Sequence, residues 1–183
     1  MRSYLFLQLI VLFCCAALLI GCNSVKPKPD NLAEYAVAVE NNQLKPQGLE
    51  FLMTVEDVCK TKGLLESKLR DIGRNTSQLI CTIAIEGLSD EVYEVFTFYE
   101  GKLINVHYMA AINEADYEKL IALVAAQAKA ILPEAMRVGD HFWIDSQGNQ
   151  MSIGGSSTDD DHNHEVITLS VSMAKSLIQS FFS

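Results

Sequence analysis

Residues 78–109, QLICTIAIEGLSDEVYEVFTFYEGKLINVHYM, decide the fold of this 183-residue chain. From Gln78 to Glu86 apolar and polar side chains alternate with a period of two, which predicts a strand with one buried face. Val92 to Tyr99 and Leu103 to Met109 are rich in β-branched and aromatic residues, and Glu100-Gly101-Lys102 between them is typical of a hairpin turn. The stretch therefore predicts three consecutive antiparallel strands.

The sequence around these strands predicts the same order of elements twice. Thr54 with Asp57 three residues later is typical of a capping box, and it predicts a helix that runs to about Leu65. A second and longer helix is expected from Asn113 to Leu132, because Pro133 cannot continue it. Further strands are expected at residues 136–144, 150–153 and 165–173.

These patterns predict an α+β fold in which an antiparallel sheet has helices packed on one face. The repeated order is consistent with a tandem pair of αβββ units at residues 49–111 and 112–183. A single sheet without any duplication is the alternative, because the residues of the two halves barely match.

The N-terminal segment has the pattern of an export signal. Met1-Arg2-Ser3 precedes an almost unbroken apolar run from Tyr4 to Ile20. Leu19-Ile20-Gly21-Cys22 then resembles the lipobox of bacterial lipoproteins. The resemblance implies that residues 1–21 are a cleaved signal peptide and that Cys22 carries the covalent lipid, with acyl chains that anchor the protein. An uncleaved membrane helix and an ordinary secretory signal are the alternatives.

Two further expectations concern the segment that follows Cys22. Asn23 follows the lipidated cysteine, and by similarity to enterobacterial lipoproteins it favours the periplasmic face of the outer membrane over the inner membrane. Residues 23–48 are expected to be a flexible tether, because Val25–Asp30 holds two prolines and two lysines and Lys45–Gly48 would break any short helix before it. The folded domain is then expected at residues 49–183.

The charge of the chain excludes one class of partner. Lys and Arg number 14 against 23 Asp and Glu, giving a net charge of −9. An acidic surface repels phosphate backbones, so nucleic acid is not expected to bind. The overall charge also gives no help in lying on anionic lipid, so the membrane would be reached through the lipid on Cys22.

The most unusual local feature is the acidic and histidine-rich segment before the last strand. Carboxylates and imidazoles at Asp159, Asp161, His162 and His164 could bind Zn²⁺ or Ca²⁺. The spacing matches neither a helical His-x-x-x-His pair nor an EF-hand loop. An exposed, solvated loop between two strands is the alternative for the same residues.

Cys59 and Cys81 are the cysteines that follow the lipobox. In an oxidising periplasm they could form a disulfide between the first helix and the first strand, stabilising the fold by about 3 kcal/mol. The alternative is two buried thiols, because each cysteine lies on an apolar face of its element.

Gly48 to Tyr108 resembles the small outer-membrane assembly lipoproteins of the SmpA/OmlA kind and the β-lactamase-inhibitor-like modules. The residues that carry the resemblance are Thr54-Val55-Glu56-Asp57-Val58 at the helix start and Tyr99-Glu100-Gly101-Lys102 at the hairpin. A Gly-x-Pro-like turn of that family is replaced by Gly73-Arg74-Asn75-Thr76. The resemblance implies a protein-binding scaffold and transfers no site residues.

The sequence holds no nucleophile elbow, phosphate loop, dinucleotide fingerprint or zinc-protease helix, and His107 and His141 have no evident nucleophile as partner. The expected function is therefore a lipid-anchored, non-catalytic binding or accessory module without a further cofactor. Its partner would be another envelope protein, bound through the sheet face or a strand edge. The alternatives are a periplasmic enzyme inhibitor and a metal-dependent sensor or enzyme, both using the Asp159–His164 loop.

Overall fold

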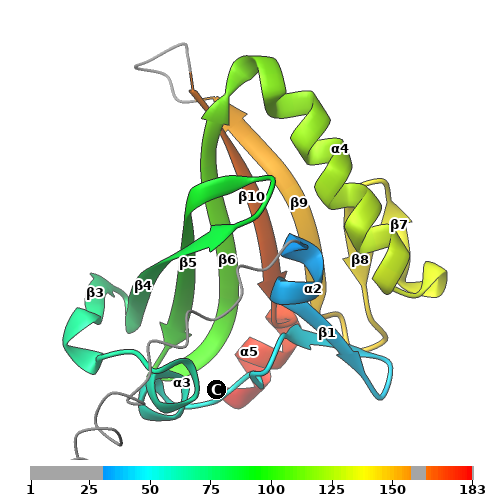
Figure 1. Cartoon of the computed structure of the whole chain (residues 1–183). Helices are drawn as coiled ribbons and strands as arrows, with labels where there is room; N and C mark the ends of the chain where they lie inside the picture. The colour runs from blue at the N-terminus through cyan, green and yellow to red at the C-terminus, as the bar shows by residue number, and fades with distance from the viewer. Residues whose placement is uncertain (1–30, 158–163, 183) are drawn as a thin grey trace, which may run out of the picture.

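A computed structural model of the chain describes residues 31–157 and 164–182. Its centre is one antiparallel sheet of eight strands with the order β3-β4-β5-β6-β10-β9-β8-β7 (Figure 1). The predicted α+β class is thereby confirmed. The strands are β3 (Arg70–Gly73), β4 (Thr76–Ile85), β5 (Ser89–Tyr99), β6 (Lys102–Asn113), β7 (Arg137–Gly139), β8 (Phe142–Ile144), β9 (Gln150–Ser157) and β10 (His164–Ser172).

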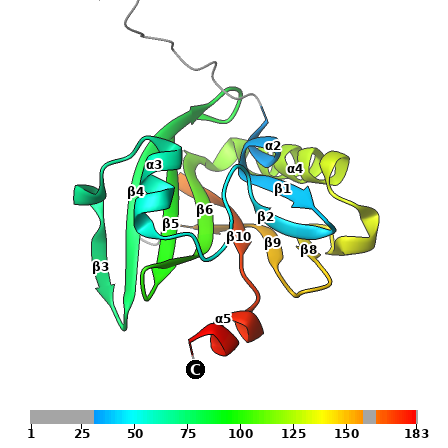
Figure 2. The same ribbon diagram turned by 90° about the horizontal axis from the view of Figure 1, so that it is seen from below.

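Helices cover one face of this sheet. Seen from below, α2, α3 and α4 lie on the same side of the strands together with a small β1–β2 hairpin, whereas α5 lies at one end of the sheet on the opposite side (Figure 2). No helix in the described ranges is both long and apolar enough to span a bilayer. The remaining elements are α2 (Leu32–Ala36), β1 (Val37–Glu40), β2 (Gln43–Pro46), α3 (Val55–Lys62), η1 (Glu66–Lys68), α4 (Glu114–Ile131), η2 (Glu134–Met136) and α5 (Lys175–Phe181).

The two halves of the sheet repeat one order of elements. Each half has a helix, a 3₁₀ turn and four strands: α3, η1 and β3–β6, then α4, η2 and β7–β10. The last strands of the halves, β6 and β10, pair at the centre, so the strand order of one half mirrors that of the other. The sequence predicted three strands in each unit, whereas each half of the structure has four. In the first half β3 was not predicted, and in the second half β7 and β8 were predicted as a single strand.

The first helix of the sheet domain starts as its sequence predicts but ends at Lys62, before the predicted Leu65. The Thr54 hydroxyl accepts the Asp57 N–H at 3.1 Å, and the Asp57 carboxylate accepts the Thr54 N–H at 3.4 Å. At the other end Gly63 adopts φ 69°, a left-handed conformation that glycine reaches without steric cost. Val58 and Cys59 are buried on the side of α3 that faces the core.

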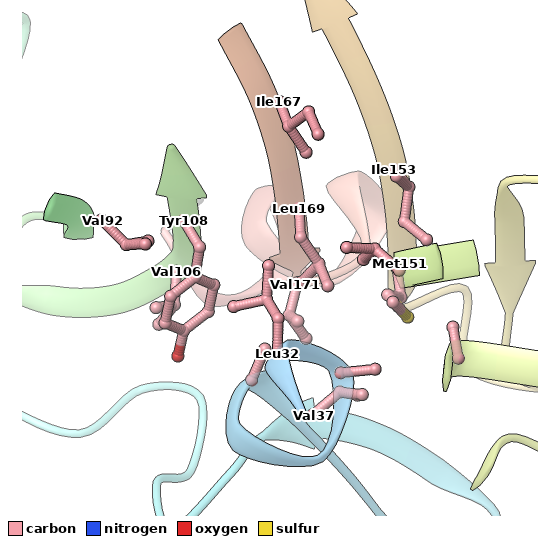
Figure 3. Packing of buried hydrophobic residues seen from close by; sticks show 14 of the residues in the cluster. Leu32, Val37, Val92, Val106, Tyr108, Met151, Ile153, Ile167, Leu169 and Val171 are labelled. Carbon is pink, nitrogen blue, oxygen red and sulfur yellow. The ribbon is translucent and has the colours of Figure 1, made fainter. Parts of the chain in front are cut away.

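Residues 31–48 belong to the folded domain, so the predicted flexible tether is wrong over this range. Asn31 caps α2 by accepting the Glu34 N–H at 3.1 Å, and the chain then turns at Asn41 and Asn42 into the β1–β2 hairpin. Leu32 and Leu44 are buried in the main core. Figure 3 shows Leu32 of α2 lying against the β10 side chains. Burial of this apolar surface outweighs the weak helix-breaking signals at either end.

The core lies between the helices and one face of the sheet. One row of buried side chains crosses six neighbouring strands in register, and each member of it is 0% exposed. Because alternate side chains point to opposite faces, this row fixes which residues of every strand lie on the open face. The row is Leu79, Phe96, Val106, Val171, Met151 and Trp143.

Candidate functional site

The candidate site is the face of the sheet that α2, α3 and α4 do not cover. Its central row lies one residue along from the core row on every strand, and most of its side chains are partly exposed. On β4, β5 and β6 this face carries apolar side chains at Ile80, Tyr93 and Met109 beside polar ones at Asn105 and His107, whereas on β10 and β9 it carries hydroxyl groups. The central row is Ile80, Val95, His107, Ser170, Ser152 and Phe142.

A pocket lies at the apolar end of this face. Its volume is about 720 Å³, and it forms where η1 and the start of β3 meet strands β4 to β6. The pocket brings two cationic side chains together with four apolar ones. Its lining residues are Lys68, Leu69, Arg70, Ile80, Tyr93 and Met109. A concave apolar surface with a few charged groups is the usual form of a binding site.

A line of hydrogen bonds connects the centre of the face to its hydroxyl-bearing end. The Asn105 amide donates to Ser170 Oγ at 3.0 Å and to Ser172 Oγ at 2.6 Å. The His107 Nδ1 atom lies 3.1 Å from Asn105 Oδ1. Both amide hydrogens of Asn105 are used, so its Oδ1 is the acceptor and His107 carries its proton on Nδ1. Burial lowers the pKa of His107, which favours the neutral form of the imidazole.

This arrangement offers hydrogen-bonding groups to a ligand. Ser170 lies directly opposite His107 in the strand register, but its hydroxyl is bonded to Asn105 instead. Within the described residues no hydroxyl or thiol is hydrogen-bonded to the His107 ring. The geometry of an activated nucleophile, with its base in contact, is therefore not formed by these side chains.

A second polar cluster lies inside the core of the first half. The Glu94 side chain points to the covered face of β5 and the residue is 1% exposed. Lys62 of α3 donates to Glu94 Oε1 at 2.7 Å, and the Tyr108 hydroxyl donates to the same oxygen at 3.0 Å. Tyr35 of α2 and the Cys81 thiol both lie 3.4 Å from Glu94 Oε2. Four donors therefore satisfy the carboxylate, as a buried charge requires.

The environment of this cluster keeps its weak acids protonated. Burial, and then the nearby Glu94 carboxylate, raises the pKa of the Cys81 thiol to about 12. The same two causes raise the pKa of both Tyr35 and Tyr108 above the ordinary tyrosine value. The cluster joins α2 and α3 to the sheet, so we assign it a structural role. Alternation along β5 could have shown that Glu94 lies on the apolar face between Val92 and Phe96, but not which residues bind it.

Cys59 and Cys81 are both free thiols, so the disulfide considered from the sequence is not formed. Cys59 is buried on α3, while the Cys81 thiol on β4 is hydrogen-bonded to Glu94. Each cysteine thus behaves as a small core residue, the alternative that the apolar faces also predicted.

The other predicted site residues lie outside the described part of the chain. Cys22, Asp159, Asp161 and His162 are in the ranges whose structure is not described. His164 begins β10, but only its backbone is described. Among the residues that the structure does describe, no group of three or more His, Cys, Asp or Glu side chains is placed to hold a metal ion. The lipidation site and the metal loop remain predictions.

The sequence predicted the turn at residues 145–149, but this buried turn also joins three parts of the fold. The Asp145 carboxylate accepts N–H groups from Leu44 at 2.8 Å, from Gln147 at 2.8 Å and from Asn149 at 2.9 Å. The Asn149 side chain in turn accepts the Ala174 N–H at 3.0 Å. The turn therefore ties β2 to the β8–β9 connection and to the start of α5.

Comparison with known proteins adds no assignment to this geometry. No protein-family model, curated protein or solved structure matches the chain.

Proposed function

We propose that this chain is a lipid-anchored lipoprotein of the bacterial envelope whose domain binds another envelope protein through the uncovered face of its sheet. The observation that carries the proposal is the pocket of about 720 Å³ on that face. It places apolar side chains of three strands beside two cations, on the face of the sheet that α2, α3 and α4 leave open.

The composition of the face supports a protein as the ligand. Protein interfaces combine an apolar and aromatic centre with a polar rim. Here Tyr93, Ile80 and Met109 supply the centre. The hydroxyl groups of Ser170 and Ser172, aligned by Asn105, supply polar groups on the neighbouring strand. Such a surface can act as an accessory module through apolar contacts and hydrogen bonds alone.

The proposed anchor places the domain close to the membrane. If Cys22 carries the lipid, eight residues, and so nine Cα–Cα steps, separate it from Asn31, the first described residue of the domain. A fully extended chain covers at most about 3.6 Å per residue, so this connection spans no more than about 32 Å. The partner is thus expected within one domain diameter of the bilayer, and Asn23 favours the outer membrane.

Site-specific crosslinking in living cells tests the proposal. A photo-crosslinking phenylalanine derivative is placed at Tyr93 in the pocket or, as the control, at Leu123, which is exposed on α4 on the helical side. We expect a crosslinked protein from position 93 and none from position 123. The Cys22→Ala variant should lose both the crosslink and the membrane fractionation. Equal crosslinking from both positions, or none from position 93, would refute the proposed site.

A further inference from the structure

The pocket lies next to the most basic part of an acidic chain. Residues 60–74 hold five Lys or Arg and two acidic residues, whereas the whole chain has a net charge of −9. Within the described ranges Lys68, Arg70 and Arg74 take part in no salt bridge, so their charges are available to a ligand. Electrostatic complementarity therefore favours an acidic partner at this place.

The same segment exposes large apolar side chains. Leu65 is 67% exposed and Ile72 is 54% exposed, and Leu69 and Tyr93 are also in the exposed class. These four belong to a set of seven large exposed hydrophobic residues in the described chain, so the set is concentrated at this edge. Apolar groups that gather beside unpaired cations indicate a ligand that carries both apolar and anionic groups.

The edge of the sheet itself is a poor place for strand addition. β3 has four residues, and its pairing with β4 is irregular between Asp71 and Gly73. The Asp71 carboxylate also accepts the Gly73 N–H at 2.7 Å, which occupies a backbone donor of this strand. Short, irregular and charged edge strands resist pairing with another chain. A ligand is therefore expected to lie across the pocket on the sheet face.

We infer that the pocket binds an extended acidic segment of the partner protein. An apolar side chain of that segment enters between Leu69, Ile80 and Tyr93, and its flanking carboxylates pair with Lys68 and Arg70. The inference rests on the proposed function and names the chemistry of the partner. A flat bilayer surface fits less well, because Ile80 and Met109 line a concavity between η1–β3 and the sheet.

Fluorescence anisotropy tests this chemistry with the full chain in phosphatidylcholine nanodiscs. The probe is a fluorescein-labelled peptide of sequence Glu-Asp-Phe-Glu-Leu-Asp, compared with its charge-reversed form Lys-Arg-Phe-Lys-Leu-Arg. We expect the acidic probe to bind and the basic one not to bind. The double variant Lys68→Glu/Arg70→Glu should weaken binding about tenfold or more, as loss of two charge pairs implies.

A matched control distinguishes the loss of the two pocket cations from an equal change in net charge. Lys119→Glu/Lys175→Glu changes the charge equally at exposed positions on α4 and α5, and it should leave binding within about twofold. Equal weakening by both double variants, or equal binding of both probes, would overturn the inference. So would loss of probe binding in nanodiscs that contain phosphatidylglycerol, since lipid headgroups would then be the occupant.

The crosslink from position 93 distinguishes this inference from the proposed function. If mass spectrometry maps the crosslink to an acidic segment of the partner, both stand. If it maps to a neutral or basic segment, the binding function stands and the acidic-segment inference fails. If no protein crosslinks at position 93, the proposed function itself fails.

Discussion

The two halves of the sheet have the same order of elements but hold their helices by different physical means. In the first half α3 has 8 residues, and a buried ion pair between Lys62 and Glu94 ties it to the sheet. In the second half α4 has 18 residues, buries apolar side chains such as Ala125 and Ala128, and lies close to β9, β10 and α2. One topology can therefore be stabilised either by a satisfied polar cluster or by close helix packing.

At the two edges of the sheet the ionic contacts lie in the other half. Arg137 on β7 pairs with Glu134 at 3.3 Å and with Asp140 at 2.6 Å, so its charge is balanced locally. Arg70 on β3 has no such partner in the described residues. Within the described residues the edge of the first half therefore keeps its cations available, which is why the proposed partner site lies there.

The largest expected effect breaks the polar cluster of the first half. Lys62→Met leaves the Glu94 side chain, which is 2% exposed, without a counter-charge. Removing one partner of a buried ion pair costs about 3–5 kcal/mol of unfolding free energy. Urea denaturation measures the loss, and adding Glu94→Gln should recover most of it. The more exposed Lys129 of the second half provides the control: a Lys62→Met loss no larger than that of Lys129→Met would contradict the assigned role.

The next largest loss of stability is expected where α4 packs closely against β9 in the second half. A methyl group on Gly155 would come within 1.8 Å of the Tyr117 hydroxyl, so Gly155→Ala must displace that ring. Such overpacking costs about 1–3 kcal/mol. Gly154→Ala is the matched control, because a methyl group there meets nothing within 4 Å and should be neutral or stabilising. If both substitutions change the urea midpoint equally, α4 is not held in the way described.

A smaller effect concerns pH. The folded-state pKa of Cys81 is raised from 9.0 to about 12, and the pKa of Tyr108 is raised from 10.0. Because these values exceed those of the unfolded chain, the stability they contribute is complete below about pH 9 and is lost as pH rises further. Urea unfolding between about pH 8 and about pH 11 should show this decline. Cys81→Ala should make it shallower, and an unchanged slope would count against the cluster.

The smallest effect is expected at the β7 edge. Asp140→Asn removes the carboxylate that pairs with Arg137 and Lys129. Both partners are surface groups, and exposed pairs contribute little to stability. The urea midpoint should stay within experimental error. A clear loss would show that the second half also depends on ionic contacts, which would remove the contrast between the halves.

The sequence predicted the regular strands and helix ends well, because their signals are local. Alternation from Gln78 to Glu86, the capping box at Thr54 and the stop at Pro133 all correspond to observed elements. The packing of Leu32 and Leu44 was missed because it depends on contacts with strands far along the chain. Short edge strands such as β3 were missed because four exposed residues show no burial pattern.

The candidate site was predictable only in part. The expectation that a sheet face would serve binding needed alternation alone. The pocket was not predictable, because it depends on how η1 and β3 approach Ile80 and Met109. The Glu94 cluster required knowledge of which helix residue faces β5, and no local pattern of Lys62 contains that information.

The Asp145 turn has a consequence for the time order of folding. Its hydrogen bond to Leu44 joins residues 101 positions apart, and Asn149 reaches forward to Ala174. Contacts at such separations form late, because a long loop must close first. The N-terminal hairpin can therefore complete its packing only after nearly the whole chain has emerged. A polypeptide that is threaded through a membrane before it folds would benefit from this delay, since premature compaction would obstruct its passage.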